Sequence, residues 1–319
     1  MAHLIEQMAY TGHTPWHGLG NPLTANQPID VWAKQAGMDW EICNTPVRFI
    51  TGKPEAIGEV LTYPDRNVLY RSDTNAPLSV VGQRYKVVQP REILEFYRDL
   101  TEVSGFELET AGVLKGGRKM WALARTGQSG TLKGNDVTNA YILLATACDG
   151  SMATTAQFTS IRVVCNNTLA VALADTNGVV KVPHSTNFDP QAVKKKLGIS
   201  VSTWNEFMYR MKALSERNVT SREAKDYISQ IFIGHNHDMA EKTQARSMTK
   251  VLNLFDGQGM GAELTSAKGT AFGLLNAVTE FVDHERKTKS IDHRLDSAWF
   301  GQGATIKRKA LDQAVSMIA

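Results

Sequence analysis

The chain is poor in cysteine and in long apolar runs, and each scarcity excludes a class of protein. It has three cysteines in 319 residues, Cys43, Cys148 and Cys165, and no CxxC pair. This argues against a disulfide framework or a zinc site of the usual spacing and fits a reducing cytoplasm. The longest largely apolar run, residues 141–147, is too short to cross a membrane, and residues 1–20 lack a secretory-signal pattern. We therefore expect a cytoplasmic protein with no membrane partner.

Net charge is also scarce. The sequence has 35 basic and 32 acidic residues, a formal charge of +3. Such a balance does not by itself mark a nucleic-acid binder, although the charge could be concentrated on one face. The hydrophobic content of 42% and the charged content of 21% are typical of a globular chain with a sizeable core.

The first half of the chain has the periodicity of strands and hairpins. Residues 1–28 read as an extended arm, and a short helix over 31–36 stops at Gly37. Alternation or β-rich composition predicts strands over residues 40–50, 67–70, 77–81 and 84–88. Pro90 opens a clear helix whose apolar stripe is Ile93, Leu94, Phe96, Tyr97 and Leu100.

Two hairpins follow this helix. The first joins residues 106–112 to 119–125 across Gly116-Gly117, and the second joins 141–148 to 153–159 across Asp149-Gly150. A strand end at Ile161 then runs into a helix that starts near Asn166 or Asn167, where an Asn side chain can cap it.

The composition changes over residues 178–190, which we interpret as a linker to a helical part. Helices are predicted over residues 190–216, 220–233, 237–254, 266–286 and 304–318, with a capping signal at Thr220 or Ser221 and Glu223. The predicted fold is α+β, with an antiparallel sheet of hairpins and packing helices in a domain over 1–180. A mainly helical domain over 181–319 follows.

Several motifs resemble catalytic or ligand-binding sites but are better explained by ordinary structural roles. The loop Gly257-Gln-Gly-Met-Gly261 follows a helix rather than a strand, so it is not a typical phosphate cradle. His235 and His237 are two residues apart and cannot share a helix face. Cys165 has no His near it in sequence, and buried Cys is the commoner state. We assign no catalytic residue and no cofactor.

One carboxylate–imidazole set keeps an enzymatic alternative open. Glu280, Asp283 and His284 lie at helical spacing, and His293 follows in a second Asp-His pair. Such a set could bind a metal or transfer protons, although a salt-bridged solvated face is its commoner use.

Basic and aromatic residues of the predicted sheet suggest a nucleic-acid surface. Cations that follow a phosphate backbone and aromatic rings that stack on unpaired bases are the groups such a surface needs. The candidate residues are Arg84, Tyr85, Lys86, Lys115, Arg118, Lys119, Trp121, Arg125 and Arg162. The competing interpretation is a set of solubilising charges on an exposed sheet.

Five segments in the right order carry a resemblance to a known family. They are Thr14-Pro-Trp-His-Gly-Leu-Gly20, Val81-Gly-Gln-Arg-Tyr-Lys-Val-Val-Gln89, Ile161-Arg-Val-Val-Cys-Asn-Asn-Thr-Leu169, Asn276-Ala-Val-Thr-Glu-Phe-Val-Asp-His284 and Trp299-Phe-Gly-Gln-Gly303. The chain resembles the DUF932 family, also called phage/plasmid-like proteins, over most of its length. The resemblance implies a mobile element in a bacterial host cell, and it supplies no catalytic residues.

A second resemblance concerns element order alone. The order strand, helix, two hairpins and helix over residues 80–174 is similar to the core order of the Rad52-like single-strand annealing proteins. Those proteins form rings that hold single-stranded DNA in a basic groove by its backbone. This implies a homo-oligomer that binds single-stranded DNA and anneals it during recombination or replication. Two alternatives stay open: a protein-binding inhibitor of a host defence system, and the metal-dependent enzyme. The sequence favours a non-enzymatic role.

Overall fold

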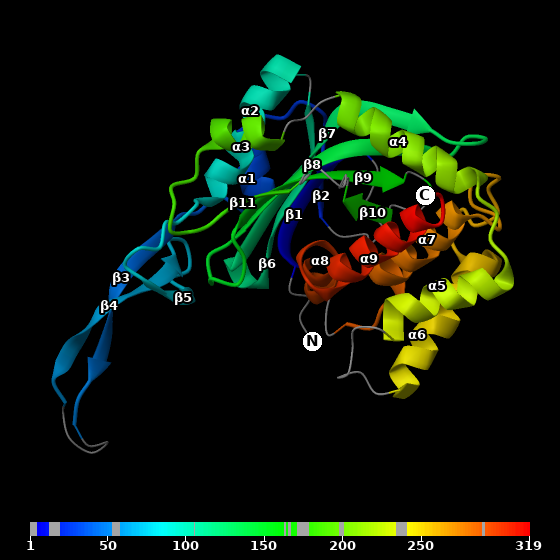
Figure 1. Ribbon diagram of the computed structural model, residues 1–319. Helices are drawn as coiled ribbons and strands as arrows, with labels where there is room; N and C mark the ends of the chain where they lie inside the picture. Colours follow the sequence, from blue (N-terminus) through cyan, green and yellow to red (C-terminus); the bar gives the residue numbers. More distant parts are fainter. Residues whose placement is uncertain are drawn as a thin grey trace. The chain divides into compact units, whose positions relative to one another are not determined.

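The computed structural model has the predicted α+β class (Figure 1). It describes residues 5–12, 20–52, 58–104, 106–162, 164, 167–170, 179–197, 201–233, 241–288 and 291–319. Within this described part, the strands lie before residue 183 and helices follow from residue 190. No helix in these ranges is long and apolar enough to span a bilayer.

Contacts along the chain define two compact units. Unit 1 comprises Met1–Thr126, Ile142–Gln157 and Val179–Gly198, and unit 2 comprises Gly127–Tyr141, Phe158–Gly178 and Ile199–Ala319. Strands β7, β8 and β9 each contribute residues to both units. The domain boundary at residue 180 stays a prediction, because it concerns independent folding rather than contacts.

The larger sheet has the hydrogen-bonded order β10-β9-β8-β7-β6-β1-β2, with β11 also paired to β9. Its strands are β1 (Ile5–Thr11), β2 (Asn21–Leu23), β6 (Glu107–Leu114), β7 (Lys119–Thr131), β8 (Val137–Ala147), β9 (Thr154–Arg162), β10 (Asn167–Ala170) and β11 (Val179–Val182). Both predicted hairpins are confirmed. Their turns use glycines with positive φ, 69° and 99° at Gly116 and Gly117 and 74° at Gly150, a region that favours glycine.

A second sheet in unit 1 contains β3 (Ile42–Ile50), β4 (Val60–Arg71) and β5 (Pro77–Gly82) in that order. Strand β5 pairs with β4 only from Arg66 to Tyr70, so the far ends of β3 and β4 pair only with each other. We call these ends, residues 48–50 and 60–62, the two-stranded ribbon (Figure 1). Pro46 and Pro64 lack an N–H for a further strand, which protects the edges from β-pairing.

The helices of unit 1 are α1 (Ile29–Gln35), α2 (Pro90–Ser104) and α3 (Pro190–Leu197). The predicted stripe of α2 is confirmed for Ile93, Leu94, Phe96 and Tyr97, which are buried. Since burial of such side chains contributes about 1.5–3 kcal/mol each, this face fixes α2 on the unit 1 core. The hydroxyl of Tyr97 lies 2.8 Å from the Ala122 carbonyl oxygen.

The helices of unit 2 are α4 (Val201–Glu216), α5 (Ser221–Ile233), α6 (Glu241–Asn253), α7 (Ala271–Glu280), α8 (Ile291–Phe300) and α9 (Gln302–Ser316). Every residue of α7 is buried, which makes it the central helix of this unit. The predicted capping box is confirmed: the Thr220 N–H donates to the Glu223 carboxylate at 2.8 Å, and the Glu223 N–H donates to the Thr220 hydroxyl at 3.3 Å.

Three predictions about extended segments were wrong. Residues 5–11 were predicted to lie in an extended arm, but they form strand β1, which pairs with β6 and β2 inside the larger sheet. The linker begins with strand β11, which pairs with β9 through Val182 and Thr154. Residues 84–88 are a loop, because the Tyr85 N–H donates to the Gly82 carbonyl and closes a turn. Tertiary pairing decided the conformation of β1 and β11, whereas a local turn decided that of residues 84–88.

Predictions about helices were also partly wrong. Asn167 begins strand β10 rather than a helix, because β10 pairs with β9 and the Asn167 amide donates to the Asn276 carbonyl. Residues 190–216 form two helices, α3 and α4, and α8 was not predicted. The motif at 14–20 lies outside the described residues except Gly20, and His235, His237, Cys165 and Asn166 lie outside them entirely.

Candidate nucleic-acid interface

The loop after β5 carries the predicted residues that fit a surface role. Arg84 and Lys86 are exposed. Tyr85 between them is half-buried: its hydroxyl donates to the Ala147 carbonyl oxygen at 2.7 Å, and its ring stacks on His184 with centroids 4.5 Å apart. Burial raises the pKa of Tyr85, so the phenol stays a neutral donor. Tyr85 therefore anchors the loop and has one ring face already occupied.

An open groove of about 860 Å³ lies beside this loop, within unit 1. We call it the basic groove. It is lined by Tyr63, Pro64, Asp65, Arg66, Gly82, Gln83, Arg84, Tyr85, His184 and Ser185. Two arginines face one aspartate, so the groove carries net positive charge before His184 is counted. The side chain of Tyr63 on its wall is 51% exposed.

The backbone positions Arg66 by a close approach to Gly82. The two residues are cross-strand partners on β4 and β5. A Cβ atom on Gly82 would lie 3.3 Å from a guanidinium nitrogen of Arg66, tighter than ordinary contact. Asp65, just before Arg66, has a positive φ of 61°, and this bend belongs to the stretch where β4 leaves its pairing with β3. The chain thus turns Arg66 into the groove.

The predicted residues at the β6–β7 turn divide into exposed and buried groups. Arg118 is exposed and Lys115 is half-buried. Lys119 is 6% exposed and Trp121 is 2% exposed. A buried indole cannot stack on a base, and a buried ammonium cannot reach a phosphate. The expected surface role of Lys119 and Trp121 is therefore corrected, because both side chains point into the core of unit 1.

Arg125 is neutralised by a neighbour. Its guanidinium donates to the Glu109 carboxylate at 2.7 Å, from β7 to β6. A phosphate would have to compete with this carboxylate, so Arg125 is a weak candidate for phosphate binding.

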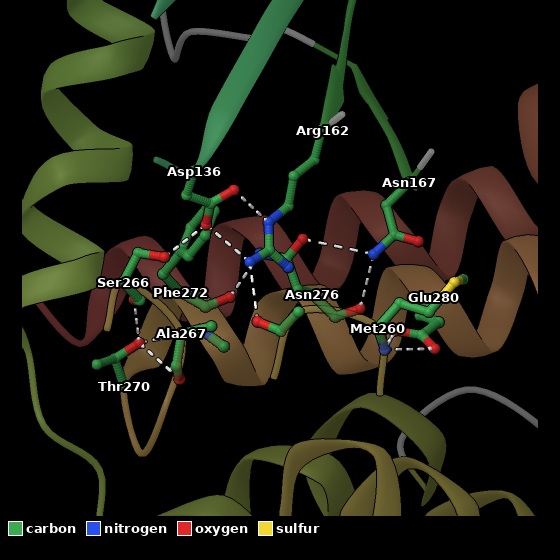
Figure 2. Close-up of polar contacts among 12 residues, drawn as sticks. Asp136, Arg162, Asn167, Met260, Ser266, Ala267, Thr270, Phe272, Asn276 and Glu280 are labelled. Atoms are coloured by element: carbon green, nitrogen blue, oxygen red, sulfur yellow. Dashed lines mark hydrogen bonds and ion pairs between the residues drawn. The ribbon is translucent and has the colours of Figure 1, made fainter. Parts of the chain in front are cut away.

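Arg162 is a structural residue of unit 2 (Figure 2). It is 4% exposed, and it donates to both carboxylate oxygens of Asp136, at 2.8 and 2.7 Å, and to the Gly261 carbonyl at 3.1 Å. The Ser266 hydroxyl donates to the same aspartate at 2.5 Å. The guanidinium is buried and paired with a buried carboxylate, so the expectation that Arg162 contacts a phosphate is corrected.

The Gly257–Gly261 loop binds an internal carboxylate rather than a phosphate (Figure 2). The Met260 N–H donates to both Glu280 oxygens, at 3.1 and 3.0 Å. Gly259 is needed there, since a Cβ atom would lie 3.0 Å from a Glu280 oxygen and 2.8 Å from the Leu254 carbonyl oxygen. Burial raises the pKa of Glu280.

In the predicted metal site, the carboxylates of Asp283 and Glu280 already accept hydrogen bonds from other groups of the protein. Asp283 accepts from Lys307 at 2.7 Å and from the Thr168 N–H at 2.8 Å. Glu280 accepts a hydrogen bond from the Met260 N–H. His284 is half-buried, and His293 is exposed. Among the described residues, no three His, Cys, Asp or Glu side chains cluster as metal ligands. These four residues therefore do not support a metal-dependent enzyme.

Three aromatic or basic residues of the groove were not among the candidates chosen from the sequence: Tyr63, Arg66 and His184. Tyr63-Pro-Asp-Arg66 combines an aromatic residue and a cation with a strand-breaking proline, a signal that could have been noticed. His184 fell in the presumed linker, where composition alone gave no reason to select it.

Comparison with known proteins places the chain in a family. A family model described as "Domain of unknown function (DUF932)" matches residues 77–299, more than half of the chain. This range includes the loop at 81–89 and the segments at 161–169 and 276–284. No curated protein and no solved structure matches the chain, so the likeness in element order to Rad52-like proteins gains no support. The chain belongs to the DUF932 family.

Proposed function

We propose that this protein binds single-stranded nucleic acid in the basic groove, during recombination or replication of the mobile element that carries it. The supporting observation is that two arginines of the groove are exposed and form no ion pair with the described residues. Arg66 and Arg84 are exposed in the groove, and among the described residues no ion pair holds either of them. Exposed, unpaired arginines are the groups that bind phosphates with little cost in lost internal contacts.

The aromatic residue of the groove favours a single strand over a duplex. Tyr63 is one of the most exposed large side chains of unit 1. Bases in a duplex are already stacked on each other, whereas an unpaired base offers its face to a ring. Arg66 and Arg84 would then hold the backbone while Tyr63 stacks on a base, with no requirement for a particular sequence.

Fluorescence anisotropy with a labelled single-stranded oligonucleotide, at low and high salt, tests this function. We expect binding at low salt that weakens steeply as salt rises. Arg66→Ala and Arg84→Ala should each weaken binding for all sequences alike and reduce the salt slope by about 1.

Arg222→Ala is the matched control. Its side chain is 93% exposed, and Arg222 belongs to unit 2 and is not among the residues that line the groove, so the substitution removes the same charge without altering the groove lining. Absence of a complex at micromolar protein and low salt would defeat the proposal, and so would equal losses for Arg84→Ala and Arg222→Ala.

Annealing by a homo-oligomer is the finer form of this proposal. An annealing protein must keep bases accessible while it holds the backbone, which the open shape of the groove would allow. Mass measurement in solution, with and without oligonucleotide, tests the oligomer. Acceleration of pairing between complementary strands tests the annealing, and a monomer that binds without acceleration would remove both.

A second candidate is capture of a host protein, and the two-stranded ribbon favours it. Large apolar side chains are exposed on both of its faces, whereas soluble proteins rarely leave such patches uncovered. They are Phe49, Ile50, Val60 and Leu61. A host protein that co-purifies with the wild type but not with Ile50→Lys, in place of nucleic acid, would favour this function.

A further inference from the structure

The imidazole of His184 lies between two main-chain carbonyl oxygens. Its Nδ1 is 3.0 Å from the Lys86 oxygen, and its Nε2 is 3.2 Å from the Met152 oxygen. The ring also stacks on Tyr85, with an interplanar angle of 13°. The histidine therefore joins the loop after β5 to the turn between β8 and β9, all within unit 1.

Proton counting decides the charge of this ring. A neutral imidazole carries one N–H, and its other nitrogen carries a lone pair. In the observed geometry that lone pair would face a carbonyl oxygen, which is itself an acceptor, at hydrogen-bonding distance. Only the imidazolium form, with a proton on each nitrogen, donates to both carbonyls.

Some charged groups around the His184 ring oppose its protonation, and others favour it. Arg66 and Arg84 line the same groove, and the carbonyl oxygen of Lys86 contacts the ring. The positive charges of these three residues oppose a further positive charge. Asp65 lines the groove as well, and Asp149 acts electrostatically on Tyr85, the stacking partner. These two carboxylates favour the imidazolium. The charges offset each other in part, which leaves the two fixed acceptors as the specific determinant.

We propose that His184 is held as an imidazolium and is the third cation of the basic groove. This inference rests on the proposed function and adds its regulation: nucleic-acid binding weakens as the pH rises and His184 loses a proton. Both ring N–H groups are engaged with the backbone, so the histidine acts on phosphates through its charge and is a positioning residue for the loop that carries Arg84.

The protonation state can be measured without any ligand. Two-dimensional proton–nitrogen spectra of the full chain, labelled with nitrogen-15 histidine, report each ring nitrogen, and His184→Gln assigns the signal among the eight histidines. We expect both nitrogens of His184 to carry protons at pH 6. A single protonated nitrogen at that pH would overturn the inference.

Binding of oligo-deoxythymidine at pH 6 and pH 8 gives the second readout. We expect about two- to fivefold weaker binding at pH 8, the effect of one partly exposed charge. His184→Gln should bind at both pH values as the wild type does at pH 8, whereas His293→Gln, an exposed histidine in unit 2, should keep the wild-type pH dependence.

The outcomes separate the two proposals. Binding that is equal at both pH values, with the groove variants still impaired, overturns the role of His184 and leaves the groove intact. Absence of binding at every pH overturns the proposed function and this use of the imidazolium with it, whatever the spectra show.

Discussion

Two pairs of cationic side chains in this protein serve opposite purposes. Arg66 and Arg84 of unit 1 reach solvent in the basic groove. Arg162 and Lys307 of unit 2 are buried, each against an aspartate, Asp136 and Asp283. A buried cation needs a carboxylate to offset its lost hydration, whereas an exposed one keeps its water until a ligand replaces it. Of these two pairs, the groove pair is therefore the one that can bind an external anion.

The largest expected effect comes from breaking the buried pair of Arg162. Arg162→Met leaves the Asp136 carboxyl buried and without its main partner. We expect the free energy of unfolding to fall by about 3–5 kcal/mol, measured by urea denaturation. Arg84→Met, the exposed counterpart, should change it by less than about 0.5 kcal/mol.

The double variant Asp136→Leu/Arg162→Met sharpens this contrast. It removes both charges at once, so part of the lost stability should return. Equal losses in Arg162→Met and Arg84→Met would show that the two classes of cation do not differ.

Lys307 should give a somewhat smaller loss than Arg162. After Lys307→Met, the Asp283 carboxylate still accepts from the Thr168 N–H and the Thr168 hydroxyl, at 2.8 and 3.0 Å. We expect about 2–3 kcal/mol of destabilisation in the same denaturation assay. Lys268→Met, at a solvent-facing position of the same unit, is the control and should unfold like the wild type.

Tyr63 tests the groove side of the comparison. Tyr63→Ala removes a stacking surface and no charge, so single-strand affinity should fall by about 1–3 kcal/mol with an unchanged salt slope. Unfolding should be little affected, because Tyr63 is exposed. Trp121→Ala, by contrast, empties a buried site and should destabilise the fold by about 3–5 kcal/mol. Unaltered affinity in Tyr63→Ala would remove stacking from the proposal.

The smallest expected effect concerns Glu280 and pH. Because burial raises its folded-state pKa above the ordinary value of 4.5, the folded protein binds this proton more tightly than the unfolded chain. The free energy of unfolding should therefore decrease as the pH rises from about 4.5 through the folded-state pKa.

Glu280→Gln removes this dependence, because an amide oxygen can still accept from Met260 without a charge. We expect the variant to gain up to about 1 kcal/mol over the wild type at pH 7, with the gap closing near pH 4. Thermal unfolding across this pH range would measure it, and a gap that widens toward acid pH would have the wrong sign.

The sequence predicted the local features of the fold well. Asp149-Gly150, Gly116-Gly117, the α2 stripe and the Thr220–Glu223 box are each set by neighbours in sequence, and each was confirmed. It was wrong where a distant partner decides, as for β1, β11 and Asn167.

The same distinction explains the candidate site. Arg84 and Arg162 are alike in sequence, and only the fold brings Asp136 to Arg162. His184 could not be selected in advance, because its two carbonyl partners come from residues 32 and 98 positions away. Burial and partnership are properties of the folded chain, so counting cations could not locate the interface.

The interleaved make-up of the two units has a practical consequence. Each unit consists of three separate stretches of chain, and strands β7, β8 and β9 each run from one unit into the other. No single truncation point can therefore release either unit whole. A fragment ending near residue 180 would keep Asp136 and Arg162 but lose Gly261 and Ser266, which hydrogen-bond to them, and Phe272 of α7, whose ring lies against the Arg162 guanidinium. The buried ion pair would then be exposed to water. Dissection of this protein is better done by point substitution than by cutting.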